Sequence, residues 1–444
     1  MTRAEEYNAL LQELEGTPDR LNFTVARAKA RTRRQKVRKW VGALLISLSA
    51  ACFAFVLLVN FSTPFAMACA KVPFFKELAE AVSFHPSFYE AVENEWVQPI
   101  EQTDTDNGYT MTVEYLIVDQ KQLNVFYTLK GGEEVDPEDA YMVRADFQDA
   151  QGEELKASIV MSDSHVNGEL YYVTADFQSE GTMPSEIHFA CNLDIHWDDS
   201  ERKSMDETVA SFAFDLSFDP RFTAQAEVVE VNRWLELDGQ KVMLKNVEIY
   251  PTHMRVNLED HPDNTAWLTD LKMYVQNEKD EQFGGIFNGI SGTGDPNSPF
   301  RISYRLESPF FAKRKHLTLN ITEAQWLEKE KQWTWVDLNT KETGYLPDGI
   351  VFHQADWDGD DLAMFFLTSC DSDYAGGHEA FASWRAPDGT EGYFNEYGWS
   401  GAPQGTEYGT SRLCVYNYVW ETIELELNYN LTSKYSEPVT IDLF

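Results

Sequence analysis

The feature that most constrains this chain of 444 residues is an uncharged stretch from Trp40 to Ala70. It contains no Asp, Glu, Lys, Arg or His, and its centre at Val41–Phe61 reads VGALLISLSAACFAFVLLVNF. A helix needs about 20 apolar residues to cross the hydrocarbon layer, so we predict a transmembrane helix over residues 40–64. Eight Lys and Arg residues lie between Arg27 and Lys39. Because basic residues resist translocation, we expect a single-pass protein of the cell membrane with a cytoplasmic N-terminus and an extracytoplasmic C-terminal part.

A removable signal peptide is the alternative interpretation of this stretch. Ala66-Met67-Ala68 has the small-x-small spacing of a cleavage site, and Cys69 follows as in a lipid-attachment box. The apolar part of a signal peptide, however, is only about 7–15 residues long, and this run is far longer. An uncleaved signal anchor is therefore the favoured prediction.

The charge of the chain changes sign across the uncharged stretch. The net charge is −37 for the whole chain, +5 for residues 1–39 and −42 for the residues after Ala70. So acidic an outer part repels nucleic acid, which argues against DNA or RNA as a partner. High solubility is the simplest explanation of the acidity.

Residues 1–39 are expected to form a cytoplasmic tail with two short helices. The first carries apolar residues at helical spacing and ends at Gly16, and the second begins at Thr17-Pro18-Asp19, where Thr17 is a plausible N-cap. Helices this short are marginal alone, so the tail either docks on a partner or lies unfolded with its basic end on lipid headgroups. The candidate partner-binding residues are Tyr7, Leu10, Leu11, Leu14, Leu21 and Val25.

Residues 65–100 are predicted to form a helical collar at the outer membrane surface. One apolar stripe there contains Phe74, Leu78 and Val82, and His85-Pro86 breaks it. A second stripe follows after the break, and packing on the next domain explains its aromatic residues. This second stripe contains Phe88, Tyr89, Val92 and Trp96.

From about residue 101 the pattern changes to strand alternation and recurs three times. Each unit begins with a turn dipeptide, at Asn107-Gly108, Asp238-Gly239 and Asp348-Gly349. Short alternating strands separated by turns are typical of antiparallel sandwiches. The fold class is therefore predicted as mainly β, with tandem immunoglobulin-like β-sandwiches at residues 101–221, 228–342 and 343–444. The expected strands common to the units begin at Leu123, Met254 and Leu362, at Leu170, Phe300 and Arg412, and at Ile187, Leu317 and Ile423. The expected closing strands are Phe212–Phe218, Trp333–Leu338 and Val439–Phe444.

Few residues suggest a metal-binding, redox or catalytic role. Asp356, Asp358 and Asp360 alternate around Gly359 as in an oxygen-ligand calcium loop, but a solvated Asp-Gly turn explains them equally well. They are therefore weak candidates, and no metal site is predicted. Cys370 and Cys414 are a candidate disulfide of the third unit, with two buried thiols as the alternative. We find no metalloprotease, nucleophile-elbow, phosphate-loop or dinucleotide motif, so neither an enzyme nor a cofactor is expected.

Segments near the membrane exit carry a resemblance to a known family. They are Asn60–Ala66, Lys71–Phe74, Glu93–Gln98 and Thr105–Gly108, followed by the strand pair that reaches Tyr127. Over residues 17–130 the chain resembles a domain-of-unknown-function family of single-pass membrane proteins of Gram-positive bacteria. Members are described as anti-sigma factors that partner extracytoplasmic-function sigma factors. The chain departs from the zinc type of anti-sigma domain, because residues 1–39 contain neither His nor Cys.

The sequence and the resemblance together suggest a membrane-anchored extracytoplasmic sensor. Its tail would bind a sigma factor, and release would follow proteolysis or a conformational change within Ser62–Val97. The competing hypothesis is a cell-surface binding or adhesive β-sandwich protein with an inert tail. Under either hypothesis the lipid bilayer is a partner, and an unknown ligand or protein is bound outside.

Overall fold

The computed structural model describes residues 2–15, 78, 82, 85–131, 140–161, 163–178, 183–195, 207–223, 226–286, 289–369, 380–400 and 408–444. The chain divides into two compact units, Met1–Glu77 and Leu78–Phe444. In the first, helix α1 covers Arg3–Glu15 and ends just before Gly16. The expected transmembrane helix and the second tail helix lie outside the described residues.

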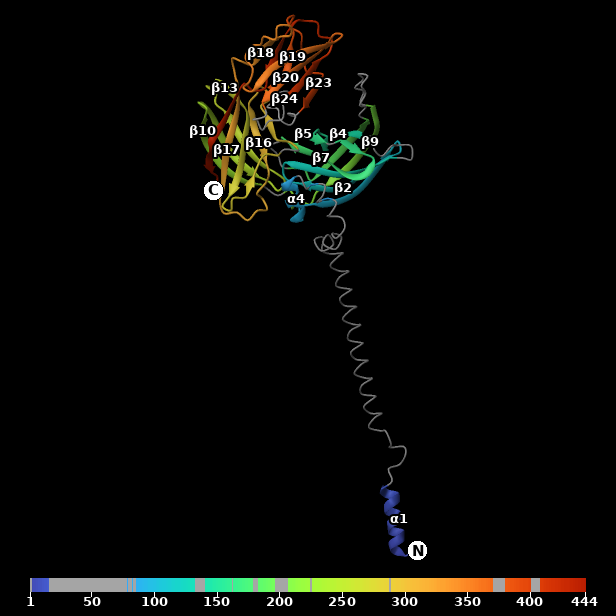
Figure 1. The fold of residues 1–444 in the computed structure, drawn as a ribbon. Coiled ribbons are helices and arrows are strands. Elements are labelled where there is room, and N and C mark those ends of the chain that lie inside the picture. The colour runs from blue at the N-terminus through green and yellow to red at the C-terminus, as the bar shows by residue number, and fades with distance from the viewer. Residues whose placement is uncertain are drawn as a thin grey trace. The chain divides into compact units, whose positions relative to one another are not determined.

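The second unit is mainly antiparallel β-structure (Figure 1). Helix α4 (Pro86–Glu93) precedes its first sheet. The first sandwich has one sheet with the order β1 (Gln98–Asp106), β2 (Tyr109–Val118), β3 (Gln122–Lys130), β7 (Asn167–Phe177) and β5 (Ala157–Met161). Its other sheet has the order β6 (Asp163–His165), β4 (Ala140–Asp149), β8 (Glu186–Ile195) and β9 (Glu207–Ser217). Both sheets contribute to one core, in which Val125, Phe147 and Phe189 are buried.

The second sandwich repeats this arrangement. One sheet has the order β10 (Glu227–Leu237), β11 (Gln240–Ile249), β12 (Met254–Asp260), β16 (Arg301–Leu306) and β15 (Gly292–Gly294). The other has the order β14 (Gln282–Phe283), β13 (Ala266–Asn277), β17 (Leu317–Glu328) and β26 (Leu431–Asp442). Val256, Leu319 and Trp326 are buried in its core.

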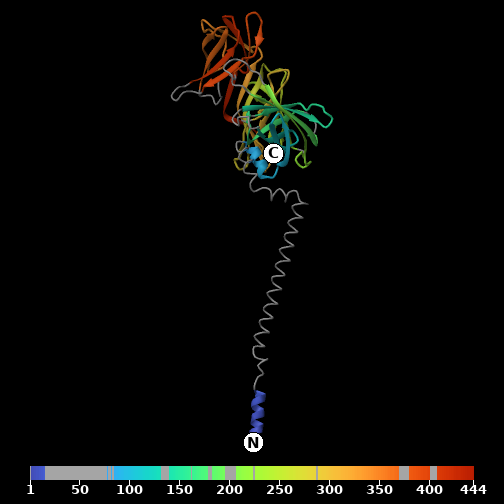
Figure 2. The same ribbon diagram turned by 90° about the vertical axis from the view of Figure 1, so that its right-hand side faces the viewer.

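The third sandwich also has two sheets. The first has the order β19 (Ile350–Asp358), β20 (Asp361–Ser369), β24 (Tyr408–Val415) and β23 (Glu396–Ser400). The second has the order β18 (Trp333–Asp337), β25 (Thr422–Leu427), β21 (Phe381–Arg385) and β22 (Glu391–Gly392). The strands of this sandwich, coloured orange to red, lie close to one another in both ribbon views (Figure 1 and Figure 2).

Two turn dipeptides act as predicted. Asn107 and Asp238 have φ of 48° and 54°, and the glycines that follow have φ of 83° and 77°. Positive φ at both central residues is the geometry of a type I′ hairpin, which joins β1 to β2 and β10 to β11. Gly349 also has a positive φ, 81°, but it precedes β19 without joining two paired strands.

The predicted assignment of the closing strands to the second and third units is wrong, although both segments are strands. β18, expected to close the second sandwich, pairs with β25 and contributes Val336 to the third core. The C-terminal strand β26, expected to close the third, pairs with β17 and buries Ile441 in the second core. Figure 1 shows the C-terminus beside β17. The third sandwich is therefore inserted between two strands of the second, because alternation shows that a segment is a strand but not which sheet it joins.

Candidate functional site

Helix α1 carries the first three predicted partner-binding residues on its surface. The side chains of Tyr7, Leu10 and Leu11 are 66%, 58% and 38% exposed. Leu14 lies in the last turn of α1, but its side chain is outside the described residues, as are Leu21 and Val25 entirely. No described residue covers this stripe, so its role as a docking face stays a prediction.

The collar helix α4 begins at Pro86, as the break at His85-Pro86 predicted. The side chain of the N-cap residue His85 makes no capping hydrogen bond. Instead Ser87 donates its backbone N–H to the Glu307 carboxylate, at 2.8 Å, and its hydroxyl to the same oxygen. A carboxylate at a helix N-terminus satisfies a free N–H group and complements the helix dipole. The second sandwich, which supplies Glu307, thus caps the collar helix.

The collar also packs on the first sandwich. His85 Nε2 lies 2.9 Å from the Tyr172 hydroxyl of β7, and burial lowers the pKa of His85. Trp96 donates its indole N–H to the Val118 carbonyl at 2.9 Å. The Trp96 ring meets Phe310 and Phe311, which precede β17, in edge-to-face contacts. Residues 85–97 are therefore bound to both sandwiches.

Most of the predicted collar stripes are buried. Leu78, Val82, Phe88 and Val92 are at most 6% exposed, which agrees with packing on the next domain. Tyr89 differs, because its side chain is 40% exposed. Phe74 lies outside the described residues.

A buried ionic cluster joins the first two sandwiches. Asp176 of β7 accepts from Arg255 Nη2 at 2.8 Å and from Arg305 Nε at 2.7 Å, and both arginines belong to the second sandwich. Burial alone would raise the pKa of Asp176, but Arg305 and then Arg255 hold it below its usual value. The carboxylate is therefore ionised, and two guanidinium groups compensate its charge.

Asp119 and His253 extend this cluster. They lie in equivalent hairpins of the two sandwiches, after β2 and before β12. Arg255 Nε donates to His253 Nε2 at 3.0 Å, so His253 carries its proton on Nδ1, which faces the Thr252 hydroxyl at 2.9 Å. Thr252 in turn donates to Asp119. Burial lowers the pKa of His253, whereas His253 and Thr252 outweigh burial to lower the pKa of Asp119.

Sequence reasoning missed this cluster. Arg255 and Arg305 were visible only as outward-facing residues of alternating strands, where a charged side chain is normally solvated. The acid in the first hairpin and the polar pair Thr252-His253 in the second were the one available signal. All members of the cluster are at most 7% exposed, so the cluster forms a buried contact between the two sandwiches.

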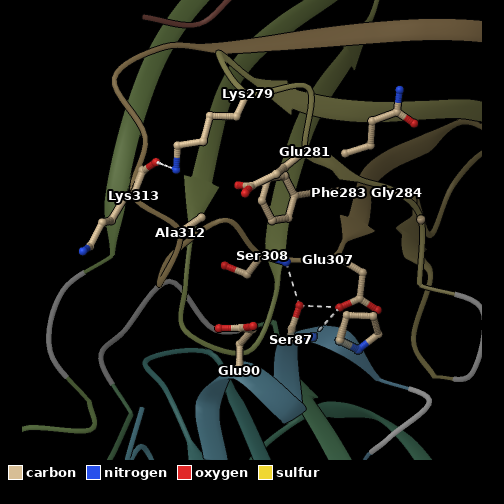
Figure 3. Close-up of a pocket in the computed structure, with 13 residues that line it drawn as sticks. Ser87, Glu90, Lys279, Glu281, Phe283, Gly284, Glu307, Ser308, Ala312 and Lys313 are labelled. Atoms are coloured by element: carbon tan, nitrogen blue, oxygen red, sulfur yellow. Dashed lines mark hydrogen bonds between the residues drawn. The ribbon is translucent and has the colours of Figure 1, made fainter. Parts of the chain in front are cut away.

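A pocket of about 670 Å³ lies where α4 meets the second sandwich (Figure 3). α4 contributes Ser87 and Glu90, while the turn between β13 and β14 contributes Lys279 and Glu281. Lys279 donates to the backbone carbonyl of Lys313 at 2.9 Å. The volume lies within the range of small-molecule sites. The remaining wall consists of Pro86, Gln282, Phe283, Gly284, Gly285, Glu307, Ser308, Ala312 and Lys313.

The structure describes the three aspartates of the weak metal candidate but only one of the two cysteines of the candidate disulfide. Asp356, Asp358 and Asp360 are exposed around the β19–β20 turn. Within the described part of the chain, no group of three or more His, Cys, Asp and Glu side chains is placed to hold a metal ion. Cys414 is buried, and burial raises the pKa of its thiol to about 11. Its expected partner Cys370 lies outside the described residues, so the disulfide stays a prediction.

Comparison with known proteins relates two regions of this chain to families of unknown function. Residues 32–131 match the model of a domain of unknown function, DUF4179, which overlaps the predicted resemblance. Residues 226–344 match that of a family of unknown function, DUF5643.

No helix among the described residues is long and apolar enough to span a membrane.

Solved and curated proteins add little to this relationship. A conserved domain protein from Bacillus anthracis, known from its crystal structure, is 18% identical and aligns with a TM-score of 0.39. The alignment covers 56% of this chain and 84% of that protein. A search of curated proteins finds no match. The chain is thus similar, in two separate regions, to families described only as domains of unknown function.

Proposed function

We propose that this protein is a membrane-anchored extracytoplasmic sensor that acts as an anti-sigma factor. Residues 40–64 cross the cell membrane, the immunoglobulin-like sandwiches lie outside, and the cytoplasmic tail binds an extracytoplasmic-function sigma factor. The proposal rests on the uncharged stretch with its flanking basic residues and on the resemblance of residues 17–130.

The observation that best supports sensing is the attachment of the collar to two sandwiches at once. Glu307 of the second sandwich holds Ser87, and Tyr172 of the first lies 2.9 Å from His85. A change in the junction between the sandwiches therefore alters contacts of the segment next to the predicted crossing. Coupling of this kind needs two arrangements of the junction, each favoured by a different ligand state.

The cytoplasmic tail supports the proposed binding of a sigma factor. An isolated helix of 13 residues is marginal in water, and α1 exposes Tyr7, Leu10 and Leu11 on one side. Such a helix gains stability when its apolar stripe enters a groove of a partner. The sigma factor is the partner that the family resemblance suggests.

The test is affinity capture of the full chain from a bacterium that also expresses extracytoplasmic-function sigma factors. We expect the sigma factor to co-purify with the natural sequence and to be lost with Leu11→Asp. Ala9→Asp, which places the same charge on the opposite side of α1, serves as the control and should retain binding. Absence of any sigma factor in the natural capture would refute the anti-sigma function.

Adhesion or ligand binding at the cell surface is the second candidate, and exposed aromatic residues of the third sandwich favour it. Trp335, Trp357, Tyr393 and Trp399 are at least 43% exposed. Exposed Trp and Tyr are typical anchors of binding surfaces. Binding of the full chain to purified cell envelopes that is lost with Trp399→Ala and kept with Leu11→Asp would support this function.

A further inference from the structure

We propose that the pocket between α4 and the second sandwich binds a small organic molecule that carries a primary ammonium group. This inference deepens the proposed function, because it assigns the ligand class of the sensor. The pocket of about 670 Å³ is large enough for such a ligand, and it joins the collar to a folded domain (Figure 3).

The charges that line the pocket select a cation. Glu90, Glu281 and Glu307 come from three different segments and surround the space beside the Phe283 ring. Glu281 accepts from Asn277 Nδ2 at 2.6 Å through Oε2, and Glu307 uses Oε2 for Ser87. Among the described residues, nothing donates to Oε1 of either carboxylate. An ammonium group has three N–H donors to offer these oxygens.

The two lysines of the wall do not neutralise the three carboxylates. Lys279 directs its ammonium group to the Lys313 carbonyl, and the side chain of Lys313 points away from the other labelled groups. Burial raises the pKa of Glu307 while Ser87 partly offsets that rise. A buried carboxylate of this kind is stabilised when a cation binds beside it.

The rest of the wall suits a short apolar body. Pro86, Phe283 and Ala312 supply apolar surface. At Gly284 and Gly285 a Cβ atom would meet nothing within 4 Å, so the wall is open on that side. A ligand that contacts Glu90 on α4 together with Glu281 would hold the collar against the second sandwich. Binding would thereby favour one arrangement of the junction.

The test measures binding of phenethylamine to the full purified chain by calorimetry. We expect a dissociation constant of about 1 mM or tighter, as befits so few ligand atoms. We expect 2-phenylethanol, which has the same shape without the charge, to bind at least about tenfold more weakly. Equal binding of the two compounds, or no binding of the amine, would overturn the proposal.

Two variants locate the binding to this pocket. Glu281→Gln should weaken amine binding about tenfold, since it removes the charge and keeps the shape. Gly284→Phe should abolish binding by filling the pocket, and the open space at Gly284 predicts an unchanged fold. Glu236→Gln, at an exposed position of β10, is the matched control and should bind normally. Unchanged binding in both pocket variants would contradict the assignment.

This readout is independent of the tail. Amine binding by a chain that captures no sigma factor would support the proposed ligand of the pocket and refute the anti-sigma function. Sigma-factor capture by a chain that binds no amine would do the reverse.

Discussion

At the residue scale, Asp176 is the centre of the contact between the first two sandwiches. It is fully buried, and its two oxygens accept from Arg255 and Arg305. Such a cluster adds little net stability over an apolar contact of the same size, because desolvating the charges opposes their attraction. Its geometry nevertheless requires one orientation of the two sandwiches, which makes removal of a single member costly.

Asp176→Asn should therefore lower the free energy of unfolding by about 3–5 kcal/mol, because two buried guanidinium groups lose their compensating charge. Chemical denaturation followed by tryptophan fluorescence measures this change. Asp215→Asn, at a 94% exposed carboxylate of the first sandwich, is the control and should leave stability unchanged. A loss below about 1 kcal/mol in Asp176→Asn would show that the cluster relaxes around the missing charge.

His253 predicts how stability depends on pH. Its pKa in the fold lies below the unfolded value of about 6.5, so folding favours the neutral form. This contribution is present above pH 6.5 and is lost as pH falls from 6.5 toward the folded pKa, by at most about 1.4 kcal/mol for each pH unit. The lowered pKa values of Asp176 and Asp119 act in the same direction, but only below about pH 4.

We expect His253→Gln to flatten the decline in stability between pH 7 and pH 5, since Gln does not titrate. The measurement is the free energy of unfolding against pH for both chains. Residual slope is expected from His85, whose pKa burial also lowers. An identical slope in the variant would show that His253 takes up its proton at the same pH in the folded and the unfolded state.

At the scale of elements, Asn430 links the segment that leaves the second sandwich after β17 to strand β26, which returns to that sandwich. Asn430 lies directly before β26 and is 1% exposed. It accepts from the Glu328 N–H at 3.0 Å and donates to the Lys331 carbonyl at 3.1 Å. Its own N–H donates to the Trp326 carbonyl at 2.8 Å. One side chain thereby joins the outgoing and the returning strand.

Asn430→Ala should cost about 2–4 kcal/mol, because it leaves two backbone groups without their partner in a buried site. Faster hydrogen exchange at residues 326–332 is the expected local sign. Asn339→Ala, in an exposed turn of the third sandwich, should change neither quantity. Unchanged exchange at residues 326–332 would contradict the role given to Asn430.

At the scale of the whole molecule, the inserted third sandwich changes what a truncation should do. Deletion of residues 431–444 removes β26, together with Ile441 and Leu443 of the second core. We expect faster hydrogen exchange in β13 and β17, while β20 and β24 keep their protection. A sequential order of sandwiches predicts the opposite result, with loss of protection in the third sandwich, so mass spectrometry of deuterium uptake separates the two.

The candidate site was only partly predictable from the sequence. The break at His85-Pro86 and the buried stripe with Phe88 and Val92 follow from helical periodicity and proline stereochemistry. The cap on α4 does not, because Glu307 lies 220 residues away in the chain. The pocket also depends on this approach, since its wall combines Glu90 of the collar with Glu281 and Glu307 of the second sandwich.

Sequence pattern alone predicted the strands common to the three units, the turns at Asn107-Gly108 and Asp238-Gly239, and helices at the places of α1 and α4. Each of these depends on residues that are neighbours in the chain, through alternation, positive φ or capping. Three-dimensional packing was needed to assign β18 to the third sandwich and β26 to the second, and to bring Asp176 to two arginines. The physical reason is that strand pairing and burial of charge depend on which surfaces meet, and local pattern carries no information about that choice.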